Sequence, residues 1–353
     1  MSCLMLTRCC SLLIGGVILL SACKGGAGEK EQKAAKDSIA AKKIDTIATR
    51  IELFSKRIAS NPKDADSYWK RGILEAKLGK YPPAILDYQL AIKIDSTKAD
   101  YYYSLADANF LMGHTRESKD EFQKCIDLDP KNTGAMMRLG ELYFYVKKYP
   151  EAIGLIDQAL KVDPYLAKAY FMKGMIFLEK GDTAKAISSM QTAVEQDTKY
   201  FDAYVQLGLV FTRKGSAAAL TYFDDAINIK PRNIEPYYDK GMFYQTVQDY
   251  DNAIKAYQEL LQVDSNYKFA LYNIGVIYFS QNKDYNQAIK YFNKAIHADS
   301  AYSFALYGRG NCYEQLGQNM KAMNDYSAAL HYNRGFMAAS DAMKDLQAKM
   351  HKK

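Results

Sequence analysis

The chain has few of the residues that metal sites and acid–base catalysis commonly use. It contains only four histidines among 353 residues, His114, His297, His331 and His351. None of them has another histidine, a cysteine or a pair of carboxylates at the spacing of metal ligands. The sequence also shows no nucleophile elbow, no candidate triad and no glycine-rich phosphate loop. We therefore expect no catalytic residue, no metal and no cofactor, and we interpret the chain as non-enzymatic.

Long apolar runs and one-sided charge are scarce as well. The longest apolar run, Ser11 to Leu20, has ten residues and is too short to span a bilayer comfortably. Lysine and arginine exceed aspartate and glutamate by seven, but they are scattered, and the dense runs are short, such as Lys42-Lys43. No basic stripe is visible, so the sequence does not favour nucleic acid as a partner.

A repeated pattern of about 34 residues fills about three quarters of the chain. Five of the seven steps from one copy to the next are 34 residues, one is 33 and one is 35. The copies start at Ala65, Ala99, Thr133, Ala167, Phe201, Ile234, Lys268 and Ser303, and the last ends near Phe336. Such a period predicts stacked helical units that bury their apolar faces against their neighbours.

Each copy keeps small and large residues at fixed positions. Position 8 is small in all eight copies: Gly72, Ala106, Gly140, Gly174, Gly208, Gly241, Gly275 and Gly310. Position 4 is large and position 11 is usually aromatic. Positions 4, 8 and 11 are spaced four and three residues apart, so they lie on one face of a helix. In most copies a second helix adds alanine at position 20 and tyrosine or phenylalanine at position 24, as in Ala84 and Tyr88.

This pattern resembles the tetratricopeptide repeat (TPR) family. The resemblance implies an all-α fold, a right-handed superhelical solenoid of eight helix-turn-helix hairpins over residues 65–336. A one-residue deletion near Gly215 and a one-residue insertion near Asn282 both fall between the two helices of a hairpin, where loops tolerate changes of length. Capping helices are expected over residues 44–62, with Phe54 at position 24 of a preceding unit, and over residues 337–353.

The start of the chain predicts export. The apolar run is followed by Leu20-Ser21-Ala22-Cys23, which closely resembles a bacterial lipobox, so residues 1–22 are interpreted as a lipoprotein signal peptide. The resemblance implies that Cys23 is acylated, for example with palmitate, and anchors the chain to a membrane. Residues 23–43 are then a flexible tether. Lys24, where some lipoproteins have aspartate, favours the outer membrane, with the chain facing the periplasm.

Two cysteines remain for the folded array. Cys3, Cys9 and Cys10 leave with the signal peptide, so only Cys125 and Cys312 are left beside the lipid-bearing Cys23. They are more than five repeats apart, which excludes a disulfide within one molecule if the array is linear. We interpret both as buried thiols.

A partner site is expected on the first helices, which in TPR proteins line a concave groove and contact ligands through positions 2, 5, 9, 12 and 13. Position 5 is apolar in every copy, and position 9 is apolar in copies four to seven, where the family is usually polar. The candidate residues are Trp69, Tyr103, Phe171, Met175, Leu178, Leu209, Tyr238, Met242, Tyr272, Val276, Phe279 and Tyr307. The alternative is that this strip packs internally or is filled by the chain itself or a second copy.

The resemblance implies a protein-protein interaction scaffold at the bacterial envelope that binds a peptide or a helix of another protein. Known TPR clamps for a C-terminal carboxylate need lysine and asparagine where this chain has Trp69, Ile73, Ser104 and Gly134, so that mode is not expected. Two other functions stay open, namely binding of envelope glycans through the aromatic rows and self-assembly into a structural homo-oligomer. The sequence does not identify the partner or the pathway.

Overall fold

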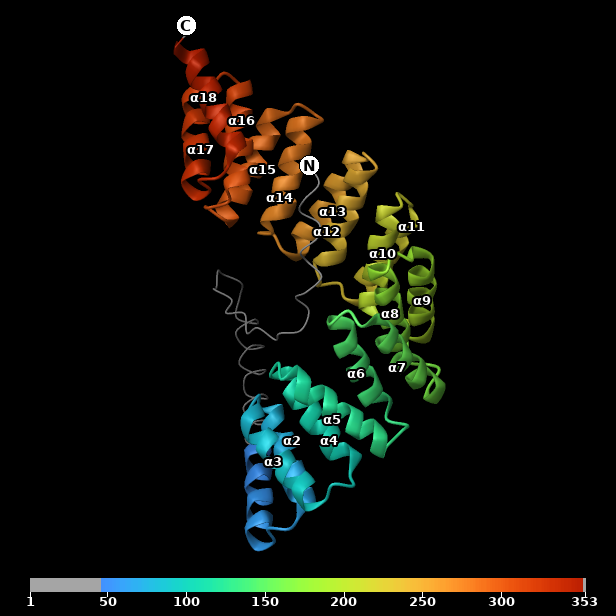
Figure 1. The fold of residues 1–353 in the computed structure, drawn as a ribbon. Helices are drawn as coiled ribbons and strands as arrows, with labels where there is room; N and C mark the ends of the chain where they lie inside the picture. Colours follow the sequence, from blue (N-terminus) through green and yellow to red (C-terminus); the bar gives the residue numbers. More distant parts are fainter. Residues whose placement is uncertain (1–45, 352–353) are drawn as a thin grey trace. The chain divides into compact units, whose positions relative to one another are not determined.

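The computed structural model describes residues 46–351, which form a succession of α-helices (Figure 1). A leading helix covers residues 46–60 of the described part. The helices that follow are α2 (Ala65–Lys77), α3 (Tyr81–Ile94), α4 (Ala99–Leu111), α5 (Thr115–Leu128), α6 (Thr133–Tyr145), α7 (Tyr149–Val162), α8 (Ala167–Glu179), α9 (Thr183–Gln196), α10 (Phe201–Arg213), α11 (Ala218–Ile229), α12 (Glu235–Thr246), α13 (Tyr250–Val263), α14 (Lys268–Ser280), α15 (Tyr285–Ala298), α16 (Ser303–Gln315), α17 (Asn319–Tyr332) and α18 (Met337–His351). The predicted signal peptide, Cys23, the tether and the last two residues lie outside the described residues.

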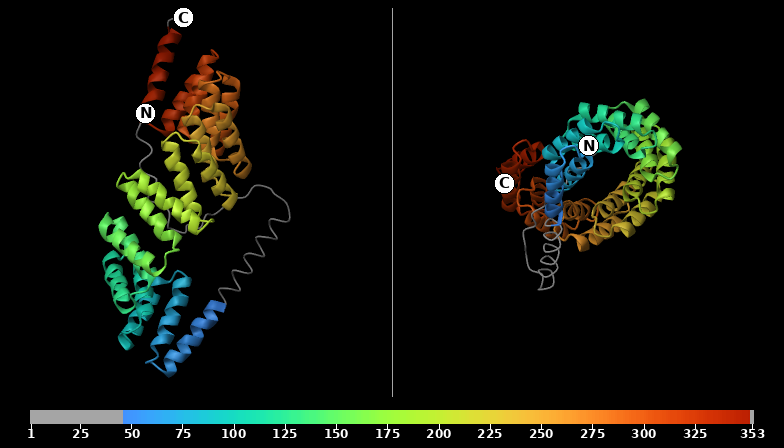
Figure 2. Two further views of the ribbon diagram at one scale, coloured as in Figure 1. Left: turned by 90° about the vertical axis from the view of Figure 1, so that its right-hand side faces the viewer. Right: turned by 90° about the horizontal axis from the view of Figure 1, so that it is seen from below.

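The described helices form two compact units, divided between Leu128 and Asp129. The first unit holds the leading helix and the hairpins α2–α3 and α4–α5. The second unit holds six hairpins, from α6–α7 to α16–α17, and the final helix α18. Each first helix packs most extensively against the second helix that follows it, and these pairs are visible from two further sides in Figure 2. The predicted all-α fold of consecutive TPR hairpins is confirmed.

Local sequence explains where several helices begin. Asp64, Asn132, Asp182, Asp249 and Asp284 are N-cap residues whose side chains accept a hydrogen bond from a backbone N–H in the first turn. Such caps satisfy one of the donors that an α-helix leaves free at its start. One helix begins a residue later than the repeat pattern predicts. The sixth repeat was expected to start at Ile234, but Ile234 is the N-cap of α12 because Pro236 suits the first turn of a helix.

In five of the eight hairpins, an aromatic ring at position 24 packs against the glycine at position 8. A Cβ added to Gly208 would lie 2.4 Å from Cε1 of Phe223, and one added to Gly241 would lie 2.4 Å from Cε1 of Tyr257. Phe223 and Tyr257 are both fully buried, so neither ring has room to move away. Where position 24 is the slimmer Ile156, the equivalent distance at Gly140 is 3.5 Å, which is ordinary contact.

Both ends of the array bury the residues that the cap pattern predicts. Phe54 of the leading helix is buried beside α2. In α18, Ala339 and Leu346 are fully buried and pack against Ala329, Ala322 and Tyr326, while Met343 is half-buried. Met350, expected on the same side, is exposed because it lies in the last turn, beyond the neighbouring hairpin.

Candidate functional site

All twelve residues of the predicted partner strip lie on first helices and are half-buried. Each side chain therefore has one part in the packed interior and another part open to solvent. Trp69 and Tyr103 belong to the first unit, on α2 and α4. The other ten belong to the second unit, where α8 carries three, α10 one, α12 two, α14 three and α16 one.

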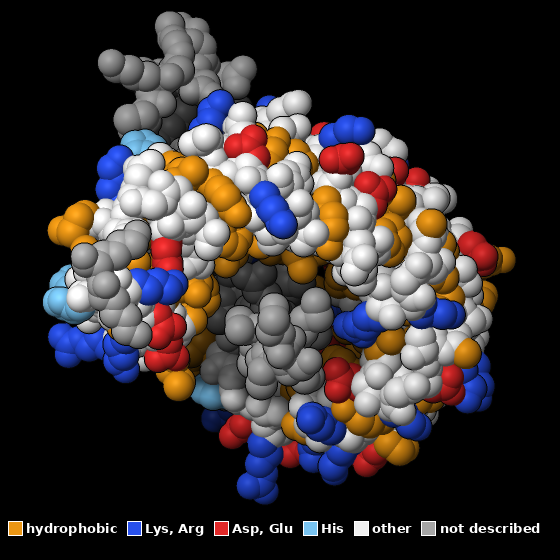
Figure 3. Space-filling model, turned by 90° about the horizontal axis from the view of Figure 1, so that it is seen from above, with side chains coloured by type: hydrophobic (Ala, Val, Ile, Leu, Met, Phe, Trp, Pro, Cys, Tyr) orange, Lys and Arg blue, Asp and Glu red, His pale blue; other side chains and the backbone are white. Residues whose placement is uncertain are grey.

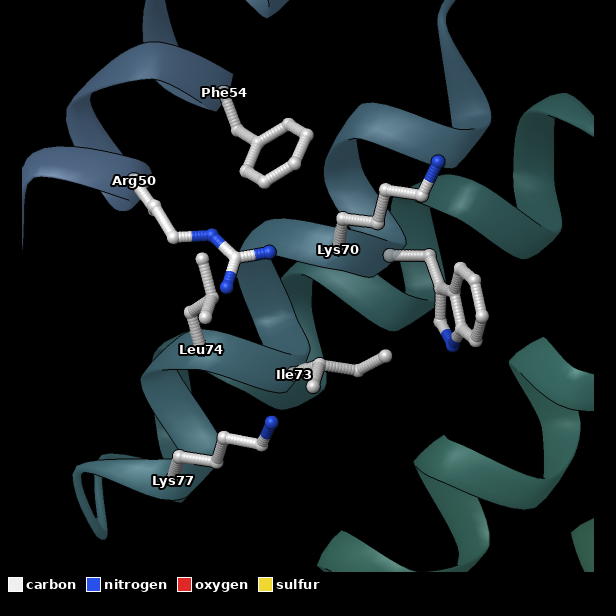
Figure 4. Close-up of a pocket in the computed structure, with 7 residues that line it drawn as sticks. Arg50, Phe54, Lys70, Ile73, Leu74 and Lys77 are labelled. Carbon is white, nitrogen blue, oxygen red and sulfur yellow. The ribbon is translucent and has the colours of Figure 1, made fainter. Parts of the chain in front are cut away.

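In the first unit, Trp69 and Tyr103 are held by neighbours on their own hairpins and the adjacent helix. The Trp69 Nε1 donates to the Ser104 hydroxyl over 2.9 Å, and its ring centroid lies 5.5 Å from that of Tyr101. The Tyr103 ring lies edge-on to Phe122 at 5.8 Å. Trp69 also lines an open pocket beside α2, shown in Figure 4, with Arg50, Phe54, Lys70, Ile73, Leu74 and Lys77.

That pocket has an apolar floor and a cationic rim. Its volume is about 230 Å³. In Figure 4 the Arg50 guanidinium reaches from the leading helix toward Leu74 on α2. Lys70, on the rim, is paired with Asp66 at 2.5 Å and is therefore partly neutralised. The pocket is small beside the cavities that hold drug-sized ligands, and we take it as the gap between the leading helix and the first hairpin.

At the start of the second unit, a buried carboxylate borders the predicted strip. Glu141 on α6 is paired with Arg138 and with Lys168 of α8, each over 3.3 Å, and accepts a hydrogen bond from the Tyr145 hydroxyl at 3.3 Å. The nearby Phe171 ring lies 5.2 Å from that of Tyr200. Burial raises the pKa of the Tyr200 hydroxyl well above its ordinary value, so this side chain stays neutral.

From α12 to the start of α18, aromatic side chains form a continuous series that we call the aromatic row. Neighbouring ring centroids along it are 4.9–6.4 Å apart. Its members are Tyr238, Tyr267, Phe269, Tyr302, Tyr272, Phe304, Phe336 and Tyr307. Seven are half-buried and Phe304 is exposed by 42%. Ring pairs at these separations add to the energy of apolar burial, so the row is a pre-ordered surface.

The aromatic row follows a rule of the repeat. In three successive hairpins, the position 5 tyrosine packs on the position 24 ring of its own hairpin and on the aromatic residue just before the next first helix. Tyr272, for example, lies 5.8 Å from Phe292 and 5.5 Å from Tyr302. The prediction missed Tyr267, Phe269, Tyr302, Phe304 and Phe336. A signal was present, because Phe269 and Phe304 occupy position 2, one of the ligand-contacting positions of the family.

Polar groups accompany the row. The Asn273 amide donates to the Tyr238 hydroxyl at 3.3 Å and to the Tyr257 hydroxyl at 3.1 Å. The Lys268 ammonium lies 5.2 Å from the Phe269 ring centroid, 5.1 Å from that of Tyr302 and 2.5 Å from the Asp299 carboxylate. Burial raises the pKa values of Tyr257 and Tyr302 far above the physiological range. These hydroxyls therefore act as hydrogen-bonding groups and not as charges.

The predicted position 9 residues are more enclosed than an open strip would be. Met242 packs against the cluster around Tyr257 and Ile274, and Val276 against the cluster around Leu271 and Phe292. Leu209 packs against two clusters, one formed by α10 and α11 and the other by α11 and Phe243 of α12. Internal packing thus uses part of each side chain, and the remaining part is exposed to solvent.

Within residues 46–351, no group of three or more histidine, cysteine, aspartate or glutamate side chains is placed to hold a metal ion. None of the described helices has the length and apolarity needed to cross a bilayer. On the face shown in Figure 3, acidic and basic side chains are interspersed with hydrophobic side chains. Cys125 and Cys312 are fully buried, and burial raises the pKa of Cys312 to about 12, so its thiol is a poor nucleophile.

With this geometry in view, comparison with known proteins gives the class of the chain. Profiles of the family described as "TPR repeat" match residues 74–113, and profiles described as "Tetratricopeptide repeat" match residues 99–132, 137–201, 171–234 and 238–303. The chain belongs to the tetratricopeptide repeat family. This is a family of interaction scaffolds, typically without enzymatic activity.

Individual relatives match only in part. The "Hsp70-Hsp90 organizing protein" of Triticum aestivum is 35% identical over 88 residues, which are 25% of this chain and 15% of that protein. The "Small glutamine-rich tetratricopeptide repeat-containing protein 2" of Mycosarcoma maydis is 32% identical over 82 residues, 23% of either chain. The chain thus matches less than a quarter of the length of these curated relatives.

Two solved structures extend the likeness over more of the fold. The C-terminal part of a TPR repeat-containing protein from Cytophaga hutchinsonii is 22% identical, covers 68% of this chain and 98% of that chain, and superposes with a TM-score of 0.60. PilF of Pseudomonas aeruginosa is 18% identical, covers 58% of this chain and 95% of that chain, and has a TM-score of 0.50. At these identities the likeness shows the fold alone.

Proposed function

We propose that this chain is a non-enzymatic scaffold of the bacterial envelope, and that the first helices of its second unit bind a peptide or a helix of another protein. The observation that carries the proposal is the aromatic row together with the half-buried candidate residues beside it. Tyrosine and phenylalanine provide a large contact area with little loss of conformational entropy, and they are frequent at the centres of protein interfaces.

The form of the surface favours an amphipathic or apolar partner segment. Met175, Leu209, Met242 and Val276 add flexible or aliphatic side chains next to the rings, and such surfaces adapt to helices that present apolar residues at helical spacing. Asn273 and the tyrosine hydroxyls supply hydrogen bonds that fix orientation. Glycan binding would require more polar side chains of this kind beside the rings.

In-cell photo-crosslinking tests this proposal. A photoreactive residue at Met242, on the first helix α12, is compared with one at Lys255, which is exposed on the second helix α13 of the same hairpin. The proposal predicts one dominant foreign protein crosslinked from Met242 and not from Lys255. Adducts to the chain itself would favour a homo-oligomer, adducts to wall glycan would favour the glycan-binding alternative, and equal adducts from both positions would contradict a site on the first helices.

The anchoring part of the proposal rests on the sequence Leu20-Ser21-Ala22-Cys23. We propose that the mature chain begins at an acylated Cys23 and is held at the outer membrane facing the periplasm, because several acyl chains give stable attachment where one is marginal. Palmitate labelling of the wild-type chain and of Cys23→Ser, followed by membrane fractionation, tests it. Label and membrane association are expected for the wild-type chain only, and equal behaviour of the two chains would contradict the anchor.

A further inference from the structure

The second helix of the first repeat has an unusual solvent face. The side chains of α3 that are exposed are Pro82, Pro83, Leu86, Gln89, Leu90, Lys93 and Ile94. Leu86, Leu90 and Ile94 are spaced four residues apart, and their exposures are 61%, 41% and 38%. Residues at this spacing lie on one side of a helix. We call these three residues the α3 apolar face. No acidic side chain is among the exposed residues of this helix.

The repeat itself does not require Leu86 and Leu90, whereas the position of Ile94 is apolar in most repeats. The positions of Leu86 and Leu90 hold polar side chains, glycine or alanine in the other seven repeats: Asp120 and Lys124, Gly154 and Gln158, Ser188 and Thr192, Thr221 and Asp225, Lys255 and Glu259, Lys290 and Lys294, and Asn324 and Ala328. Packing of the hairpin uses the opposite side of α3, where Ala84, Tyr88 and Ala91 are buried. Leu86 and Leu90 are therefore large aliphatic side chains that stand in solvent at positions where the other repeats are polar or small, which indicates a surface that is covered by something else.

The charges near the α3 apolar face are mostly positive. Lys93 is exposed on the helix, and Lys80 and Lys98 are exposed just before and just after it. Lys80 lies 3.6 Å from the Glu75 carboxylate, and Asp95 accepts hydrogen bonds from the backbone N–H and hydroxyl of Thr97. A helix that combines exposed leucine and isoleucine with lysine, and lacks acidic side chains, is suited to the surface of an anionic bilayer.

The position of α3 along the chain also favours a contact with the bilayer. It lies in the repeat nearest the proposed anchor at Cys23, and the described chain starts at residue 46. A flexible segment of about 20 residues has a typical end-to-end distance of roughly 25 Å. The first repeat is therefore the repeat that follows the proposed anchor most directly along the chain.

We infer that the α3 apolar face rests on the lipid bilayer and sets how the first unit is presented at the membrane; this inference rests on the proposed anchoring. A second copy of the chain is the competing occupant. Stable interfaces bury about 800 Å² on each partner, and three partly exposed aliphatic side chains on one helix supply far less. The same small apolar area is sufficient for a membrane contact, because the lipid anchor already supplies the attachment.

The test places a fluorophore between the two leucines without altering them. Gln89→Cys is labelled with an environment-sensitive dye in the full-length, processed protein, which is reconstituted in vesicles of phosphatidylethanolamine and phosphatidylglycerol in equal parts that carry a nitroxide-labelled lipid. The matched control is Gln258→Cys, the same residue type at the same position of α13 in the sixth repeat, and both glutamines are exposed. Cys125 and Cys312 are buried and should not take the label.

The inference predicts a blue shift and strong quenching by the nitroxide lipid at residue 89, and neither at residue 258. Both signals should be lost when Leu86→Gln and Leu90→Gln are added, and circular dichroism should stay unchanged because both leucines are exposed.

Mass spectrometry of the Cys23 peptide is done first. Acylated protein with equal signals at residues 89 and 258 overturns the inference and leaves the anchor intact. A blue shift that needs no lipid and grows with protein concentration assigns the face to a second copy and also overturns it. A Cys23 peptide without acyl chains overturns the anchor and the inference together.

Discussion

The residues at position 8 differ in the neighbours that they meet. Gly241 lies against the buried ring of Tyr257, whereas Gly140 lies against the slimmer Ile156. In Gly241→Ala the new Cβ forces a buried ring to shift, and we expect the free energy of unfolding to fall by about 1–3 kcal/mol. In Gly140→Ala the space is sufficient, and the better helix propensity of alanine should leave the free energy unchanged or raise it by up to about 1 kcal/mol. Urea unfolding followed by circular dichroism measures both, and equal losses would contradict this packing.

A second prediction concerns Glu121 in the first unit. Burial raises the pKa of this carboxyl from an ordinary value of 4.5 to about 7, against the opposing effect of two hydrogen bonds from the Asn109 amide, at 3.1 and 2.8 Å. The folded state therefore binds this proton more tightly than the unfolded state does. Its contribution to stability is present at acid pH and is lost as the pH rises from about 4.5 to about 7.

The variant Glu121→Gln isolates that contribution, because glutamine keeps the shape and has no proton to lose. We expect the stability difference between the variant and the wild-type chain to shift in favour of the variant as the pH rises through this window. Thermal melts at a series of pH values measure the difference. A difference that does not change with pH would show that Glu121 ionises normally.

At the scale of the helices, basic residues at position 7 tie neighbouring elements together. Arg309 of α16 donates to both oxygens of the buried Asp325 on α17, at 2.8 and 2.6 Å. Lys240 of α12 contacts Asp224 of α11 at 2.8 Å, but that carboxylate is 53% exposed. Arg309→Ala leaves a buried carboxylate without its partner, and we expect a loss of about 3 kcal/mol. Lys240→Ala leaves a solvated carboxylate, so the expected loss is below about 1 kcal/mol. Chemical denaturation of both variants measures the losses, and a larger loss for Lys240→Ala would contradict the assignment.

The elements were predictable from the sequence because the small residues repeat with the period of the hairpin. The helices could be located from three features of the sequence: the glycines at position 8, the aromatic rings at position 24, and the one-residue deletion and insertion in the turns. The candidate residues lie on first helices, as the repeat pattern predicts, but their degree of enclosure was not predictable, since it depends on how Tyr267, Tyr302 and Phe336 pack from the loops. The solvent face of α3 was missed. The sequence carried a signal for it, because the other seven repeats hold polar side chains, glycine or alanine at the positions of Leu86 and Leu90.

For the whole molecule, α18 should act as the cover of the last hairpin in the second unit. Its Leu346 and Ala339 bury the sides of Tyr326, Ala322 and Ala329 that would otherwise face solvent. We expect a chain that ends at Arg334 to be less soluble and to associate with itself, because terminal repeats of an array need a polar outer face. Light scattering over a range of concentrations measures this. A truncated chain that stays monomeric and equally soluble would show that α18 is not a cap.

The most direct test of the scaffold is the affinity of the partner identified by crosslinking. The dissociation constant is measured for the wild-type chain, for Val276→Glu and Phe304→Glu on the first helices α14 and α16, and for Lys290→Glu on the outer side of α15. Placing a carboxylate in an apolar contact should weaken binding by about tenfold or more, and Lys290→Glu should bind as the wild-type chain does. Unchanged affinity for Val276→Glu and Phe304→Glu, in variants that remain folded, would contradict the central claim that the partner binds along the aromatic row.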